Sequence, residues 1–134
     1  MTQDGMPGLE GAWVPVGATV SGAALEVSEL RVRYLLFESG HYRIIDRSNR
    51  VVDSGDYRTG SDAAAAQLDI VGRTGMGAGR TLRAIYELQG DALTVCYDLE
   101  GDARPESMRA EAGQLLLRIA YTRAALGFAG AAPA

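Results

Sequence analysis

Short stretches of alternating hydrophobic and polar residues, rich in β-branched and aromatic side chains, recur along the chain. Each stretch is bounded by Gly, Asp, Asn or Ser, which is typical of β-strands separated by turns. The pattern predicts eight strands, at residues 9–16, 31–38, 41–47, 51–58, 66–72, 81–88, 92–98 and 114–123. The fold class is therefore predicted to be all-β.

The connections between these stretches are short and polar, as in ESGHY at 38–42 and LQGDAL at 88–93. Such glycine-containing turns are typical of hairpins and make neighbouring strands antiparallel. An open sheet of eight strands would leave two unpaired edges, and closure into a barrel removes both. The sequence predicts a single eight-stranded up-and-down barrel. Residues 23–30, with apolar residues at helical spacing, predict one short helix across an open end.

Composition places the chain among globular proteins of one domain. It has 134 residues, of which 47% are hydrophobic and 22% charged. The net charge of −4 argues against nucleic acid or an anionic membrane as a partner, because both need a clustered positive surface. We find no apolar stretch of about 18 residues that would predict a membrane span. Cys96 is the only cysteine, which is compatible with a cytoplasmic location.

Several motifs follow one another in a fixed order. They are LEGAW at 9–13, FESGHY at 37–42, GDY at 55–57, AIYELQGDALTVCYD at 84–98, RP at 104–105 and QLLLRIAYTR at 114–123. In this order the chain resembles an uncharacterised lipocalin-like domain family that is abundant in planctomycetes. The resemblance spans residues 9–123, and leaves an N-terminal extension at 1–8 and an Ala/Gly-rich tail at 124–134. It implies a small calycin-type barrel with Trp13 plugging its base, and it implies no cofactor.

An eight-stranded barrel has an interior that side chains just fill or that holds one small ligand. Aromatic residues occur in most predicted strands, and four of them are predicted to bind a ligand: Phe37, Tyr42, Tyr86 and Tyr97. Arg33 and Arg83 join this set because they share strand parity with predicted interior residues, Arg33 with Leu35 and Phe37, and Arg83 with Ile85. If these faces point inward, each guanidinium needs a carboxylate partner such as Glu87 or an anionic ligand group.

His41 is the only histidine of the chain, which excludes a histidine-rich metal site and a catalytic triad that needs a second histidine. We predict no metal and interpret His41 as an exposed residue beside the turn at Gly40. Segment 71–82, VGRTGMGAGRTL, is glycine-rich like a phosphate-binding loop, but a strand rather than a helix follows it. It is predicted to be a mobile loop at the barrel rim, where Arg73, Met76 and Arg80 gate the interior.

Three functions remain open at this point, and the sequence favours the first. The barrel binds a small, mainly apolar molecule without catalysis. Alternatively, it is an isomerase or cyclase that acts by confining its substrate and through Tyr and Arg hydrogen bonds, which needs neither a triad nor a metal. In the third, the interior is filled and the barrel serves as a protein-interaction module. The oligomeric state is not indicated.

Overall fold

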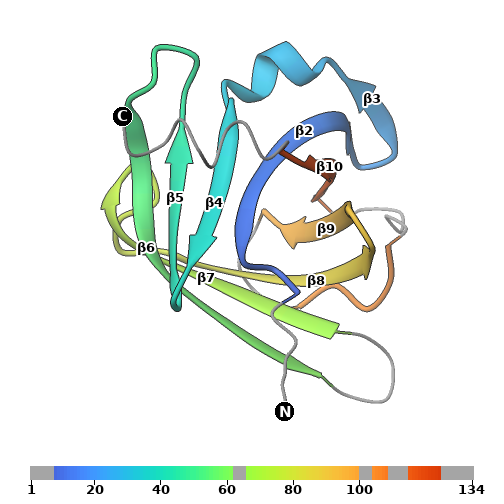
Figure 1. The fold of residues 1–134 in the computed structure, drawn as a ribbon. Helices are drawn as coiled ribbons and strands as arrows, with labels where there is room; N and C mark the ends of the chain where they lie inside the picture. The colour runs from blue at the N-terminus through green and yellow to red at the C-terminus, as the bar shows by residue number, and fades with distance from the viewer. Residues whose placement is uncertain (1–7, 62–65, 100–103, 109–114, 125–134) are drawn as a thin grey trace.

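We describe residues 8–61, 66–99, 104–108 and 115–124 in a computed structural model of the protein (Figure 1). The predicted extension at 1–8 and tail at 124–134 fall outside this range apart from Gly8 and Ala124. The described residues form nine strands and one 3₁₀ turn: β2 (Gly11–Val20), β3 (Ala23–Leu25), η1 (Val27–Leu30), β4 (Tyr34–Glu38), β5 (His41–Ile45), β6 (Val51–Ser61), β7 (Ala66–Gly75), β8 (Thr81–Gln89), β9 (Ala92–Asp98) and β10 (Leu116–Arg123). No helix among them is long and apolar enough to span a membrane.

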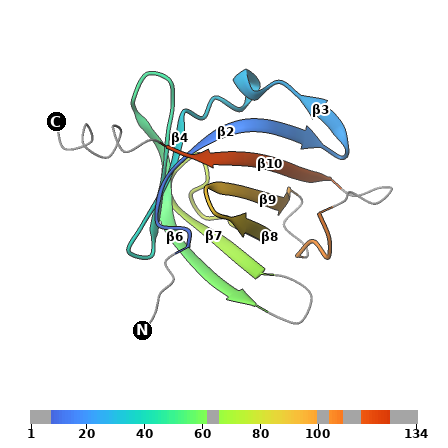
Figure 2. The ribbon, with the colours of Figure 1, turned by 45° about the vertical axis from the view of Figure 1, so that its right-hand side comes forward.

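The strands form a closed barrel, as predicted. From β4 to β10 each strand pairs antiparallel with the next along the chain, and β2 pairs with both β4 and β10. Eight strands, β2 and β4 to β10, therefore enclose one interior (Figures 1 and 2). Short β3 pairs only with the end of β2. The hairpin of β6 and β7 is longer than predicted, because backbone pairing continues through polar residues as far as Ser61 and Ala66.

The segment predicted as a helix, 23–30, is helical only in its second half. Ser21 and Gly22 have φ of 51° and 87°, in the left-handed region, and reverse the chain directly after β2. Residues 23–25 consequently fold back on β2 and pair with it. A single 3₁₀ turn, η1, follows at Val27–Leu30. Its last residue, Leu30, packs against the barrel core, so the segment lies across one end as expected.

The other end of the barrel is closed by Trp13, and we call it the Trp13 end. The Trp13 side chain is fully buried, and its Nε1 donates a hydrogen bond to the Leu9 carbonyl oxygen at 2.9 Å. The Arg123 guanidinium lies 4.3 Å from the centre of the Trp13 ring and donates to the carbonyl oxygens of Glu10 (2.8 Å) and Gly8 (3.2 Å). A stacked cation with paired donors thus seals this end. Trp13 therefore closes the base of the barrel.

Two hydrophobic clusters lie on opposite faces of the barrel wall. The larger fills the interior and includes Trp13, Phe37, Leu68 and Val95. The smaller lies on the outer face of β8, β9 and β10 and consists of Ile85, Cys96 and Leu116, with Met108 packed against it. Because successive side chains of a strand point to opposite faces, β8 and β9 contribute to both clusters. The wall is therefore apolar on both sides here.

Candidate functional site

The half of the barrel toward η1 contains a cavity of about 170 Å³. Most of its lining is aliphatic: Leu30, Val32, Leu35, Ile44, Ile70, Leu82, Leu117 and Ile119. Four polar side chains complete the lining: Tyr42, Asp53, Tyr97 and Tyr121. Concave apolar sites with a few placed polar groups are the usual form of small-molecule sites in proteins. We regard this cavity as the candidate ligand site.

The hydroxyls of Tyr97 and Tyr121 form one polar pair in the cavity wall. Their oxygens are 2.9 Å apart, and both side chains are buried. Tyr97 comes from β9 and Tyr121 from β10, where alternation places them on the interior face with Leu117 and Ile119. Burial raises the pKa of Tyr97 to about 12 and that of Tyr121 well above its ordinary value. Both tyrosines therefore stay neutral near pH 7.

A second polar pair joins Tyr42 and Asp53. The Tyr42 hydroxyl donates to Asp53 Oδ1 at 2.8 Å, and burial together with this hydrogen bond raises the pKa of Tyr42. The Asp53 carboxylate also lies against the backbone of Gly77, where a Cβ atom would come within 2.9 Å of both its oxygens. Gly77 belongs to the loop between β7 and β8, so this loop approaches the cavity through Asp53.

The end of the cavity is formed by η1 and the residues after it. Leu30 closes η1, and Val32 follows within two residues. Both side chains are partly exposed, in contrast to Leu35, which is 3% exposed deeper in the barrel. A backbone hydrogen bond holds this segment against the end of β5: the Arg33 N–H donates to the Ile45 carbonyl oxygen at 2.7 Å. Leu30 and Val32 therefore separate the cavity from solvent at the η1 end.

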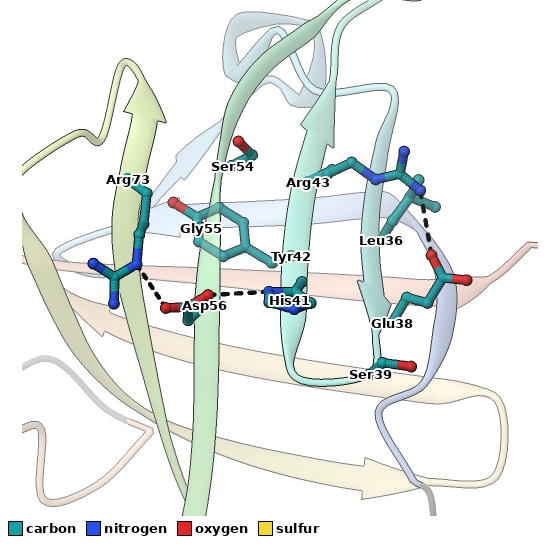
Figure 3. Close-up of a pocket in the computed structure, with 10 residues that line it drawn as sticks. All are labelled: Leu36, Glu38, Ser39, His41, Tyr42, Arg43, Ser54, Gly55, Asp56 and Arg73. Atoms are coloured by element: carbon teal, nitrogen blue, oxygen red, sulfur yellow. Dashed lines mark hydrogen bonds and ion pairs between the residues drawn. The ribbon is translucent and has the colours of Figure 1, made fainter.

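A larger hollow, of about 430 Å³, lies on the outer face of β4, β5, β6 and β7 (Figure 3). Asp56 accepts a hydrogen bond from Arg73 Nε at 2.7 Å and lies 3.0 Å from His41 Nδ1. The bond to Arg73 lowers the pKa of Asp56. Arg43 pairs with Glu38 at 3.5 Å. His41 is exposed, as predicted, and these charges pair with one another in contact with water, where ion pairs are weak.

No protein-family model, curated protein or solved structure matches this chain. Its function has to be argued from its own residues. Among the described ranges, 8–61, 66–99, 104–108 and 115–124, we find no group of three or more His, Cys, Asp or Glu side chains placed to hold a metal ion. The polar chemistry of the cavity lining is that of three tyrosine hydroxyls and one carboxylate.

Of the four aromatic residues predicted to bind a ligand, the structure places two, Tyr42 and Tyr97, in the cavity lining. Phe37 is buried in the core and its ring centre lies 4.5 Å from that of Tyr57. Tyr86 packs against the same core. Neither Phe37 nor Tyr86 lines the cavity.

Arg33 and Arg83 lie outside the barrel, so the predicted inward orientation is wrong for both. Arg33 precedes the first residue of β4, where strand alternation has not yet begun, and its Nη1 donates to Asn49 Oδ1 at 2.7 Å. Arg83 does share a face with Ile85, but that face is the outer one, on which Ile85 is buried in the cluster that Met108 covers. Neither guanidinium lines the cavity.

The residues predicted to gate the interior lie in or beside a hydrogen-bonded loop. Gly72 N–H donates to the Arg80 carbonyl, and Met76 N–H donates to the Val52 carbonyl on β6. Arg73 points to the outer face toward Asp56 (Figure 3). The Met76 side chain is 82% exposed. None of these three side chains lines the cavity, and their gating role stays a prediction.

Sequence reasoning missed several cavity residues. Tyr121, Leu117 and Ile119 alternate along the last strand, and this period of two was a usable signal for a common interior face. Asp53 gave no such signal, because its hairpin is rich in charged residues. The structure assigns it to the interior because Ile44, its register partner on β5, also lines the cavity.

Proposed function

We propose that this barrel binds one small, mainly apolar molecule in the cavity toward η1. The observation that carries the proposal is an aliphatic cavity inside a barrel that is sealed at its opposite, Trp13 end. An apolar cavity of about 150 Å³ can hold benzene, so a cavity of about 170 Å³ accommodates a single ring of similar size. Membership of the lipocalin-like family and a cytoplasmic location are part of the same proposal.

The protonation and the hydrogen bonds of the cavity tyrosines favour binding without catalysis over an isomerase or cyclase. Tyr97 and Tyr121 have raised pKa values and hold their protons near pH 7, so they orient a ligand rather than exchange protons with it. The Tyr42 hydroxyl is committed to Asp53. A cavity of this size also argues against a barrel that is filled and serves only as an interaction module.

The test is calorimetric titration of the protein with benzene, together with a variant that fills the cavity. Leu117 lines the cavity, and Leu117→Phe adds a ring to this space. We expect saturable binding to the natural chain, a raised melting temperature at saturation, and loss of both effects in the variant.

The matched control is Val16→Phe, which adds the same ring at an exposed position of β2. This control should bind benzene as the natural chain does. Equal binding by Leu117→Phe and Val16→Phe, or no saturable binding to any of the three proteins, would refute the proposed function.

A further inference from the structure

The hydroxyl pair in the cavity contains one more proton than its internal hydrogen bond uses. Tyr97 and Tyr121 each bring one O–H, and a single proton lies between oxygens 2.9 Å apart. The second proton must point elsewhere. Within the described part of the chain, the structure records no other hydrogen bond for either hydroxyl. A buried O–H without an acceptor is costly.

Either hydroxyl of the pair can donate to the other, because the geometry fits both directions. In each direction the hydroxyl that accepts keeps its own O–H. A hydroxyl that accepts a hydrogen bond is itself polarised into a stronger donor. The pair therefore has one available O–H, and both side chains line the cavity.

The surroundings restrict what can receive this proton. Apart from the two tyrosines, the polar lining consists of Asp53 and Tyr42, which are hydrogen-bonded to each other. An anionic ligand group would share a low-dielectric cavity with the Asp53 carboxylate, which opposes its binding. A neutral oxygen acceptor on an apolar body avoids this repulsion, because the aliphatic lining contacts the body and the Tyr97–Tyr121 pair donates to the oxygen.

We infer that the ligand is a neutral, ring-sized molecule with a carbonyl oxygen that accepts a hydrogen bond from the Tyr97–Tyr121 pair. This inference rests on the proposed function, since it names the ligand class of the same cavity. The available O–H of the pair fixes the orientation of the carbonyl, and the hydrogen bond within the pair holds that hydroxyl in place. No covalent step is involved, and the ligand leaves as it entered.

The experiment compares two probes of nearly the same shape, cyclohexanone and methylenecyclohexane, in which a CH₂ group replaces the oxygen. Affinities of both are measured by titration against the natural chain and against the double variant Tyr97→Phe/Tyr121→Phe, which removes both hydroxyls, so that differences in hydration between the probes cancel in the cycle. We expect the variant to bind cyclohexanone about tenfold more weakly and methylenecyclohexane with unchanged or greater affinity.

A vibrational measurement reports the hydrogen bond without relying on affinity. The carbonyl stretch of cyclohexanone bound to the natural chain should lie at lower frequency than that of cyclohexanone in an alkane. The double variant Tyr97→Phe/Tyr121→Phe should restore the alkane value. Tyr86→Phe is the control, because Tyr86 is a partly buried tyrosine of the same core that does not line the cavity.

Failure of the inference can be told apart from failure of the proposed function. If both probes bind but the carbonyl stretch keeps its alkane frequency, the inference is overturned and the cavity remains a binding site. If cyclohexylamine binds more tightly than cyclohexanone and Asp53→Asn removes that preference, the ligand is an amine held at Asp53, and the inference is likewise overturned. If neither hydrocarbon nor ketone binds, both proposals fail.

Discussion

Tyrosine hydroxyls are the main polar groups of the barrel interior. Tyr42 donates to Asp53 at 2.8 Å, Tyr57 donates to Glu10 at 2.7 Å, and Tyr97 and Tyr121 pair at 2.9 Å. Burial raises the pKa of all four, and in Tyr42 and Tyr57 the hydrogen bond to a carboxylate raises it further. The chain has six tyrosines and two phenylalanines, and this excess is explained by these internal hydrogen bonds.

The raised pKa values predict a loss of stability in alkali. In the unfolded chain tyrosine ionises near its ordinary pKa of 10.0, whereas in the folded chain Tyr97 ionises at about 12. The unfolded state therefore releases protons first, and the free energy of unfolding falls as the pH rises above about 10. Below the unfolded pKa the contribution is fully present.

Urea unfolding midpoints measured between about pH 8 and pH 11.5 check this dependence. Replacement of one of these residues, Tyr57→Phe, should make the decline shallower, because one group with a raised pKa is removed. Midpoints that stay constant over the whole interval would show that the tyrosines ionise equally in the folded and unfolded states.

At the scale of elements, the loop between β7 and β8 is shaped by close backbone contacts. A Cβ atom on Gly72 would collide with the Gly77 carbonyl oxygen, and Gly79 N–H donates to the Gly72 carbonyl at 3.1 Å. Gly75, with φ of 87°, turns the chain back toward β8. The glycines thus allow the loop to fold against the strand end and to bring Gly77 against Asp53.

Substitution of Gly72 tests this description. We expect Gly72→Ala to lower the free energy of unfolding by about 2 kcal/mol or more, because the loop must open to admit the methyl group. Gly17→Ala is the control, since a Cβ atom there would meet nothing within 4 Å and the φ of Gly17 is not in the left-handed region. Chemical denaturation compares the two variants, and equal stability would contradict the role given to the loop.

At the scale of the whole molecule, the two ends of the barrel differ. The Trp13 end is closed by a buried indole, a stacked arginine and backbone hydrogen bonds. The η1 half instead leaves a cavity behind Leu30 and Val32. A ligand that enters from the η1 end would therefore meet a sealed base.

The barrel could be predicted from sequence, because strand alternation and short turns are local signals and closure follows from unpaired edges. The cavity could be predicted only in part. Tyr42 and Tyr97 were found because their alternating strands have a clear interior face, whereas Arg33 precedes its strand and Ile85 is buried on the outer face. Here the wall has two apolar faces, and the outer one is buried because Met108, in the segment 104–108, packs against it. This contact between distant segments has no local signature in the sequence.

Methyl resonances of the lining residues test the central claim, ligand binding in the cavity, most directly. Benzene shifts nearby methyl signals through its ring current, so a titration followed by methyl-selective NMR locates it. We predict saturable shifts for Leu35, Ile70 and Leu117 in the cavity, and none for Leu36 in the outer hollow. Saturable shifts at Leu36 alone, or no shifts at the cavity residues, would contradict ligand binding in the cavity.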